Sequence, residues 1–293
     1  MASEVDPDQY TKSGLFTKNY FRDVYPEIDP KKPELSQAGK VAIVTGASRG
    51  LGKAIALAFA HAGIKGLVLG ARSEKALGET KAAVLAISPS THVLAVPVDI
   101  SVEESVEKFY QTISATFETV DTLVNNAGVF TDSFDVISKV SPAKWFRDFE
   151  VNVKGTFLVT AGFLKAQERK PSGVPTIINL VTFPGLVPPS LSSYFISKAA
   201  VLRFTEHIAA ENPQVAVFSI SPGVSPTDMT LEMFKPFAKD SPDLTGAVAV
   251  YLSATRPAYL VGRYMSVNWD VSELAERKDE IVDSGLLKFV IKQ

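Results

Sequence analysis

The chain of 293 residues contains no cysteine, which excludes disulfide bonds, thiolate metal ligands and a cysteine nucleophile. It has only three histidines, His61, His92 and His207. No two of them have the spacing of metal ligands, so we expect no metal site. Its 30 basic and 32 acidic side chains leave a net charge of −2. This balance argues against binding of nucleic acid through bulk charge.

Long apolar runs and an N-terminal secretory signal are also missing from the sequence. No stretch approaches 18 uncharged apolar residues, and the first eight residues are acidic rather than apolar. We therefore expect a soluble, cytoplasmic protein with no membrane partner. Hydrophobic residues make up 46% of the chain and charged residues 21%, which is ordinary for a globular protein.

From Lys40 onward, short apolar runs alternate with helical stretches. Strands covered by helices on both faces have this continuous apolar character. The alternation predicts an α/β fold with a doubly wound, Rossmann-like parallel sheet in one domain. The expected strands are 41–44, 66–69, 93–98, 122–124, 176–181, 215–220 and 264–267, and the expected helices are 53–61, 73–85, 102–117, 141–170, 193–211 and 243–253.

Residues 1–39 differ from the rest in having four prolines and five aromatic side chains without a clear period. They form either a partly ordered extension or an arm that packs on its own body or on a partner subunit, and the aromatics favour the arm. Three segments follow from this division: an N-terminal arm or extension (1–39), a domain of alternating strands and helices (40–272) and a C-terminal tail (273–293).

The first expected strand leads into a glycine-rich turn, where residues 45–52 read TGASRGLG, and then into a helix. Glycines let a backbone reach positive φ and approach a ligand closely. The free N–H groups of a helix start suit a pyrophosphate. Because the turn lies between the first strand and the first helix, a dinucleotide site is favoured over a purely structural turn.

The spacing Gly-x-x-x-Gly-x-Gly resembles that of the short-chain dehydrogenase/reductase family, and the NNAG at residues 125–128 resembles another motif of that family. The resemblance covers residues 40–272. It implies that Asn126 ties the central strands together and that Gly128 leaves room for the cofactor ribose. At the two motifs, the residues implied in cofactor binding are Gly46, Ser48, Arg49, Gly50, Leu51, Asn126, Ala127 and Gly128.

Two arginines favour NADP over NAD as the cofactor. Arg72 lies about 20 residues beyond the glycines, where an acid would bind a free ribose 2′-hydroxyl, and no acid follows until Glu74. Arg49 and Arg72 are typical of NADP-preferring members and could form forked bonds to a 2′-phosphate, the alternative being two solvated arginines. The resemblance also places Asp99 at the adenine amino group, with Ile100 near the ring.

Tyr194 and Lys198 stand at positions i and i+4 of an expected helix, and so on one face of it. A nearby ammonium favours a phenolate and lowers the pKa of a tyrosine, which suits Tyr194 for proton transfer. The family places a serine hydroxyl on the substrate oxygen. Here Thr182 is the expected replacement, although the bare spacing falls on Val181, and Ser192 and Ser193 are further candidates.

Asn152 interrupts an apolar stripe in the expected helix 141–170, and a buried amide needs partners. It is either a satisfied core amide or, as the resemblance implies, the residue that holds a relay water near Lys198. After the sixth expected strand, residues 221–227 read SPGVSPT. The resemblance implies cofactor contacts from Pro222, Gly223 and Thr227. Residues 228–240 would form an apolar lid over a hydrophobic or aromatic carbonyl substrate.

These features predict an NADPH-dependent carbonyl reductase with Tyr194, Lys198, Thr182 and Asn152 as its catalytic set. Two other classes stay open: a cofactor-binding sensor or scaffold without redox turnover, and a cofactor-dependent isomerase or dehydratase. By analogy with the family, the helices 141–170 and 193–211 would form the faces of a homodimer or homotetramer.

Overall fold

The computed structural model describes residues 6–131, 135–170 and 173–290. Within these ranges, seven parallel strands form one sheet in the order β3-β2-β1-β4-β5-β6-β7. The chain adds strands toward one edge of the sheet up to β3 and toward the other edge from β4 onward, so β1 and β4 form a switch point. Ligands bind at the carboxyl ends of the strands at such a point. The strands are β1 (Val41–Thr45), β2 (Gly66–Ala71), β3 (His92–Pro97), β4 (Thr122–Asn125), β5 (Thr176–Leu180), β6 (Ala216–Ser221) and β7 (Arg263–Ser266).

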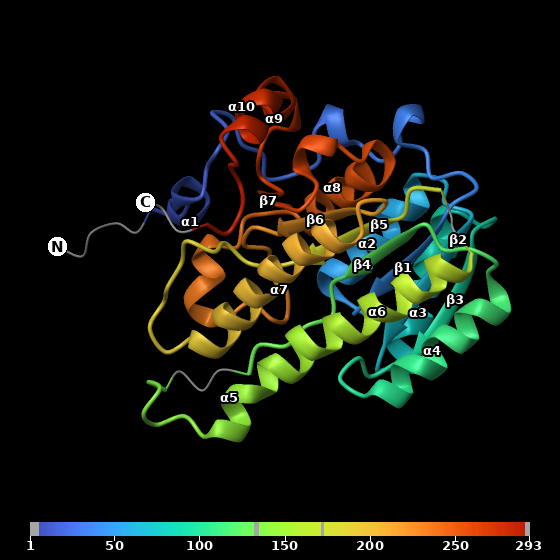
Figure 1. The fold of residues 1–293 in the computed structure, drawn as a ribbon, viewed down its shortest axis with the longest axis horizontal. Helices are drawn as coiled ribbons and strands as arrows, with labels where there is room; N and C mark the ends of the chain where they lie inside the picture. Colours follow the sequence, from blue (N-terminus) through green and yellow to red (C-terminus); the bar gives the residue numbers. More distant parts are fainter. Residues whose placement is uncertain (1–5, 132–134, 171–172, 291–293) are drawn as a thin grey trace.

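Helices cover both faces of the sheet, and two hydrophobic clusters fill the space between (Figure 1). On one face α2 packs against α8, where Gly246 allows close contact with Ala54 and Ala58. On the other face, the Tyr110 hydroxyl of α4 donates to the Val159 carbonyl oxygen of α6 at 2.7 Å. The predicted doubly wound α/β fold is confirmed. The helices around the sheet are α2 (Gly50–His61), α3 (Glu74–Ile87), α4 (Glu103–Thr116), α5 (Pro142–Asp148), α6 (Thr156–Arg169), α7 (Ser192–Glu211) and α8 (Pro242–Thr255).

The stretch expected as one helix over 141–170 is divided in three. The Ser141 hydroxyl caps α5 with Pro142 at the first position, and α5 is followed by a π-helical segment, η3 (Phe149–Gly155), and then by α6. A π-helix accommodates extra residues per turn, which an apolar pattern of period 3.6 does not reveal. Such segments often occur at functional sites, and this one carries Asn152.

Residues 6–39 pack on the body of the molecule as α1 (Gln9–Ser13) and the short 3-10 helices η1 (Pro26–Ile28) and η2 (Pro33–Leu35) (Figure 1, blue). Ile28 and Leu35 are buried in the core beside α8. Tyr20 forms an isolated bridge with Trp269, just beyond β7. Near the other end of the chain lie η4 (Glu232–Phe237), η5 (Ala258–Leu260), α9 (Val271–Glu276) and α10 (Lys278–Asp283).

The helices of the described segments are either too short or too polar for a membrane crossing. Within the same segments, we find no group of three or more acidic or histidine side chains arranged to hold a metal ion.

Candidate active site

The glycine turn between β1 and α2 closes tightly on itself and on the end of β4. Gly46 has a φ of +66°, and a Cβ at this position would lie 2.7 Å from the Asn126 amide nitrogen. A Cβ at Gly52 would lie 2.2 Å from the carbonyl oxygen of Gly46. The Asn126 amide donates to the carbonyl oxygens of Thr45 at 2.8 Å and of Gly46 at 3.2 Å. The turn therefore depends on residues without side chains, fixed by Asn126.

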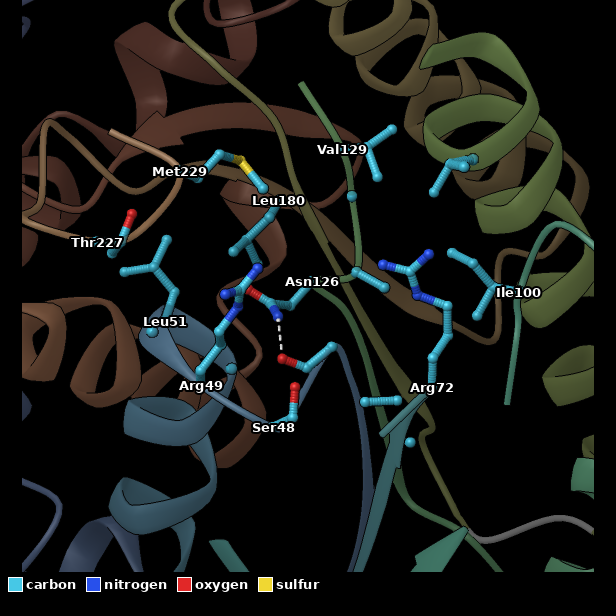
Figure 2. Close-up of a pocket in the computed structure, with 18 of the residues that line it drawn as sticks. Ser48, Arg49, Leu51, Arg72, Ile100, Asn126, Val129, Leu180, Thr227 and Met229 are labelled. Carbon is cyan, nitrogen blue, oxygen red and sulfur yellow. Dashed lines mark hydrogen bonds between the residues drawn. The ribbon is translucent and has the colours of Figure 1, made fainter. Parts of the chain in front are cut away.

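A cavity of ≈ 470 Å³ opens at the carboxyl ends of the central strands (Figure 2). It brings together segments that are far apart in the sequence, from the glycine turn to the segment after β6. Three residues of the expected site, Gly223, Asn152 and Thr182, are not among the described residues that line the cavity. The expected residues that do line it are Gly46, Ser48, Arg49, Gly50, Leu51, Arg72, Asp99, Ile100, Asn126, Ala127, Gly128, Tyr194, Lys198, Pro222 and Thr227.

Arg49 and Arg72 reach into this pocket from the start of α2 and from the end of β2 (Figure 2). Arg49 forms a 2.9 Å ion pair with Asp228, and both side chains are largely exposed. Asp99 accepts hydrogen bonds from the Ser101 hydroxyl at 2.6 Å and backbone N–H at 2.9 Å. These bonds hold the pKa of Asp99 below its usual value, so the carboxylate is ionised at neutral pH.

Tyr194 and Lys198 face the pocket from the first turns of α7. The Lys198 ammonium donates to the Leu180 carbonyl oxygen at 2.8 Å and lies 6.0 Å from the centroid of the Tyr194 ring. Burial lowers the pKa of Lys198 to about 8, with the charge of Asp148 opposing this shift. Burial also raises the pKa of Tyr194 to about 12, and Asp148 adds to it. The expected lowering of the Tyr194 pKa is not found in the protein alone, because desolvation dominates.

Asn152 is completely buried, and its amide group is fully engaged. Its oxygen accepts from the Val129 N–H at 2.8 Å, while its nitrogen donates to the Val129 carbonyl oxygen and the Ser197 hydroxyl, both at 3.0 Å. A Cβ on Gly128 would lie 3.1 Å from the Asn152 oxygen and 3.4 Å from the Lys198 nitrogen. Asn152 thus joins the segment after β4 to α7 close to Lys198, without lining the cavity.

The candidates for the residue at the substrate oxygen lie in two places, after β5 and at the start of α7. Val181 lines the cavity, whereas Thr182 follows it, partly buried, in the loop toward α7. The other two candidates have partners on α5: Ser192 accepts from the Trp145 indole N–H at 3.0 Å, and Ser193 donates to the Trp145 carbonyl oxygen. The assignment of Thr182 to the substrate oxygen stays a prediction.

Sequence reasoning missed two residues of α5. Arg147 lines the cavity, and Asp148 is a completely buried carboxylate close enough to influence the pKa values of Tyr194 and Lys198. The available signal was the position of Asp148, one turn before Asn152 and beside the apolar Phe149. An acid on a buried face needs an explanation as much as an amide does.

Known proteins resemble this chain over most of its length. The family model described as short chain dehydrogenase matches residues 40–236. The short chain dehydrogenase mpl6 of Monascus purpureus is 37% identical over 275 residues, which cover 91% of this chain and 92% of the relative. A 3-oxoacyl-[acyl-carrier-protein] reductase of Synechocystis is 32% identical over 241 residues, covering 78% of this chain and 95% of the relative.

Solved structures show the same fold. The Pseudomonas aeruginosa RhlG/NADP active-site complex has 25% identity and a TM-score of 0.72, covering 81% of this chain and 98% of that one. A 3-ketoacyl-(acyl-carrier-protein) reductase from Brucella melitensis complexed with NADH has 28% identity and a TM-score of 0.71, covering 79% and 98%. The chain belongs to the short-chain dehydrogenase/reductase family, whose members are oxidoreductases that use nicotinamide dinucleotides.

Proposed function

We propose that the protein reduces a ketone or aldehyde group of a hydrophobic or aromatic small molecule with NADPH. The observation that carries the proposal is the placement of Tyr194 and Lys198 in the same cavity as the glycine turn. The cofactor, when bound, supplies the hydride. The glycine turn fits such a group, because Gly46 and Gly50, both at positive φ, line the cavity and place no side chain between their backbone and a ligand.

Tyr194 is the proposed proton donor to the carbonyl oxygen. With a pKa of about 12, its phenol is protonated throughout the physiological range and available for donation. Lys198 is proposed to hold the cofactor ribose, and its pKa of about 8 leaves it mostly charged at pH 7. Asn152 fixes the helix that carries both residues, and the Thr182 hydroxyl would polarise the substrate oxygen.

The choice of NADPH is supported by Arg49 and Arg72, which line the pocket from two sides. A guanidinium can bind a 2′-phosphate through two parallel hydrogen bonds. We expect kcat/KM with NADPH to exceed that with NADH. Arg72→Ala should reduce the ratio of kcat/KM with NADPH to kcat/KM with NADH about tenfold or more. Arg169→Ala, an exposed substitution on α6, should leave this ratio unchanged. A ratio unaffected by Arg72→Ala would contradict the assignment.

The apolar substrate is supported by the segment 228–240. Within this segment Met229 lines the cavity and Phe237 is buried. Two relatives in the comparisons are named for reducing 3-oxoacyl chains, whose reacting group is a ketone on an apolar chain. An apolar pocket with few polar groups binds such a molecule mainly by desolvation.

The direct test compares Tyr194→Phe with Tyr110→Phe. Tyr110 is a partly buried tyrosine of α4 whose hydroxyl donates to the Val159 carbonyl oxygen of α6, and it does not line the pocket. Tyr194→Phe should bind NADPH normally, as followed by fluorescence titration, and lose at least about a thousandfold in kcat on a panel of hydrophobic ketones. Tyr110→Phe should retain turnover. Full activity in Tyr194→Phe would refute the mechanism.

We also propose that the protein is a homodimer or homotetramer whose subunits meet through α6 and α7. The Phe157 side chain on α6 is 52% exposed, and its ring lies 6.1 Å from that of Phe204 on α7. Ile196 on α7 is also exposed. A Phe157→Asp variant should lower the molar mass found by light scattering to that of a monomer. Wild-type protein that is already monomeric would refute the proposal.

A further inference from the structure

Asp148, the last residue of α5, is completely buried and only half satisfied. Its Oδ1 accepts from the Thr131 N–H at 3.0 Å and from the Thr131 hydroxyl at 2.5 Å. Its Oδ2 has no hydrogen-bond partner in the described part of the chain. Burying a carboxylate without full compensation is costly, so this position calls for a reason other than stability.

The face of the helix on which Asp148 lies joins two parts of the active site. Trp145, Asp148 and Asn152 are spaced i, i+3 and i+7, which places them along one side. Trp145 binds both serines at the start of α7. Asn152 binds Val129 and, on α7, Ser197. Asp148 stands between these two contacts, and its own partner is in the segment after β4.

Asp148 and Asn152 bind the two residues of that segment that flank Phe130. Asn152 binds the backbone of Val129, and Asp148 binds Thr131 through both its N–H and its hydroxyl. Phe130, between them, packs edge-on against the Tyr194 ring with centroids 4.6 Å apart. Asp148 and Asn152 therefore form a clamp on either side of Phe130, and the position of the Tyr194 ring depends on this clamp.

The charge of Asp148 acts on the same groups. The ionisable groups that its charge reaches are Tyr194 and Lys198 from α7, whereas the neighbouring Arg147 pairs with Glu150. A buried negative charge opposes the formation of a second negative charge nearby, so it favours the neutral phenol of Tyr194. It also favours the charged form of Lys198. A neutral phenol gives a proton, as reduction requires, whereas oxidation requires a phenolate that accepts one.

We propose that Asp148 is a positioning residue that clamps Phe130 against Tyr194 and keeps the Tyr194 phenol neutral, which extends to higher pH the range in which Tyr194 can donate a proton. This inference rests on the proposed carbonyl reductase function. It assigns to Asp148 no contact with the substrate.

The experiment measures pH profiles of kcat in both directions, with a hydrophobic ketone and with the corresponding alcohol. Asp148→Asn keeps an oxygen for Thr131 and removes the charge. In this variant, the pH above which kcat of reduction falls should be lower by about half a unit or more. The pH at which kcat of oxidation rises should be lower by the same amount. Glu150→Gln, an exposed substitution two residues away, should leave both pH values unchanged. Unchanged pH values in Asp148→Asn would overturn the role of the charge.

The clamp is tested by Thr131→Val and Phe130→Leu, which keep the carboxylate and remain informative if Asp148→Asn does not fold. Each should lower kcat about threefold or more, with both pH values and the Kd for NADPH unchanged. An unaltered kcat in both variants would overturn the clamp. The Tyr194→Phe result separates this inference from the proposed function: an active Tyr194→Phe refutes the reductase mechanism itself, whatever the Asp148 variants do.

Discussion

The region expected to bind the cofactor, called the cofactor side, and the region around the expected lid 228–240, called the substrate side, are built in different ways. On the cofactor side, the glycine turn, the end of β2 and the segment after β4 contact one another through backbone atoms and two small side chains, Thr45 and Asn126. On the substrate side, the arm, the loop after β5, the segment 228–240 and the segment after β7 contact one another through side chains. Backbone contacts tolerate few residue types and leave motifs, whereas side-chain contacts tolerate many and leave none.

Three contacts illustrate the second kind of construction. Tyr10 of the arm packs edge-on against Phe237 of the segment 228–240, with ring centroids 4.7 Å apart. The Trp269 indole donates to the Gly14 carbonyl oxygen at 2.9 Å. Asp240, fully buried, accepts from Arg22 of the arm at 2.6 Å. The arm therefore supports the expected lid, and substitutions in it should act on the substrate side alone.

The largest effect is expected on the cofactor side, from Gly52→Ala. Its Cβ would lie 2.2 Å from the backbone oxygen of Gly46, which cannot yield without opening the turn. We expect a loss of about 4 kcal/mol in unfolding free energy by urea titration, together with loss of NADPH binding. Gly78→Ala is the matched control, because Gly78 lies in α3 with nothing within 4 Å of its Cβ. It should stabilise the protein by up to about 1 kcal/mol, and equal losses in the two variants would refute the argument.

A smaller but still large effect is expected on the substrate side, from Asp240→Ala. It removes the acceptor of Arg22, of Asn268 and of the Val224 N–H. Because the Arg22 guanidinium is mostly buried, we expect a loss of about 3 kcal/mol by urea titration.

The exposed ion pair between Arg49 of the glycine turn and Asp228 of the segment 228–240 supplies the comparison for Asp240. Asp228→Ala removes the partner of Arg49, and both of these side chains are about 70% exposed or more. The loss in unfolding free energy should be under about 1 kcal/mol. If Asp228→Ala cost as much as Asp240→Ala, the two ion pairs would not differ in the way their burial indicates.

Lys198, where the two sides meet, should give an effect that depends on pH. Its pKa is about 8 in the folded protein, below the ordinary value of 10.5, so the folded state disfavours its charged form. Between these pH values the unfolded chain binds the proton and the folded chain does not, so stability from this group rises with pH. Relative to Lys198→Met, the wild type should gain about 2 kcal/mol between pH 7 and pH 10 by urea titration. A constant difference would contradict the lowered pKa.

The contrast between the two sides also explains what sequence reasoning could reach. The sheet, the glycine turn and the pair Tyr194–Lys198 depend on local spacing, and the spacing predicted that they meet in one pocket. The π-helical segment at Asn152 was not predictable, because its apolar pattern fits an α-helix equally well. Asp148 and Asp240 were missed because their partners, Thr131 and Arg22, lie 17 and 218 residues away in the sequence. No periodicity records such a pairing.

The smallest effect should come from Tyr10→Leu, at the contact between the arm and the segment 228–240. Leucine keeps the apolar bulk but loses the edge-on geometry with Phe234 and Phe237, which is worth about 1 kcal/mol. Because this contact lies on the substrate side, KM for a hydrophobic ketone should rise while the Kd for NADPH, measured by fluorescence titration, stays constant. A change in the Kd for NADPH without a change in KM would mean that the arm acts on the cofactor side. The two sides would then not be independent of each other, as this prediction requires.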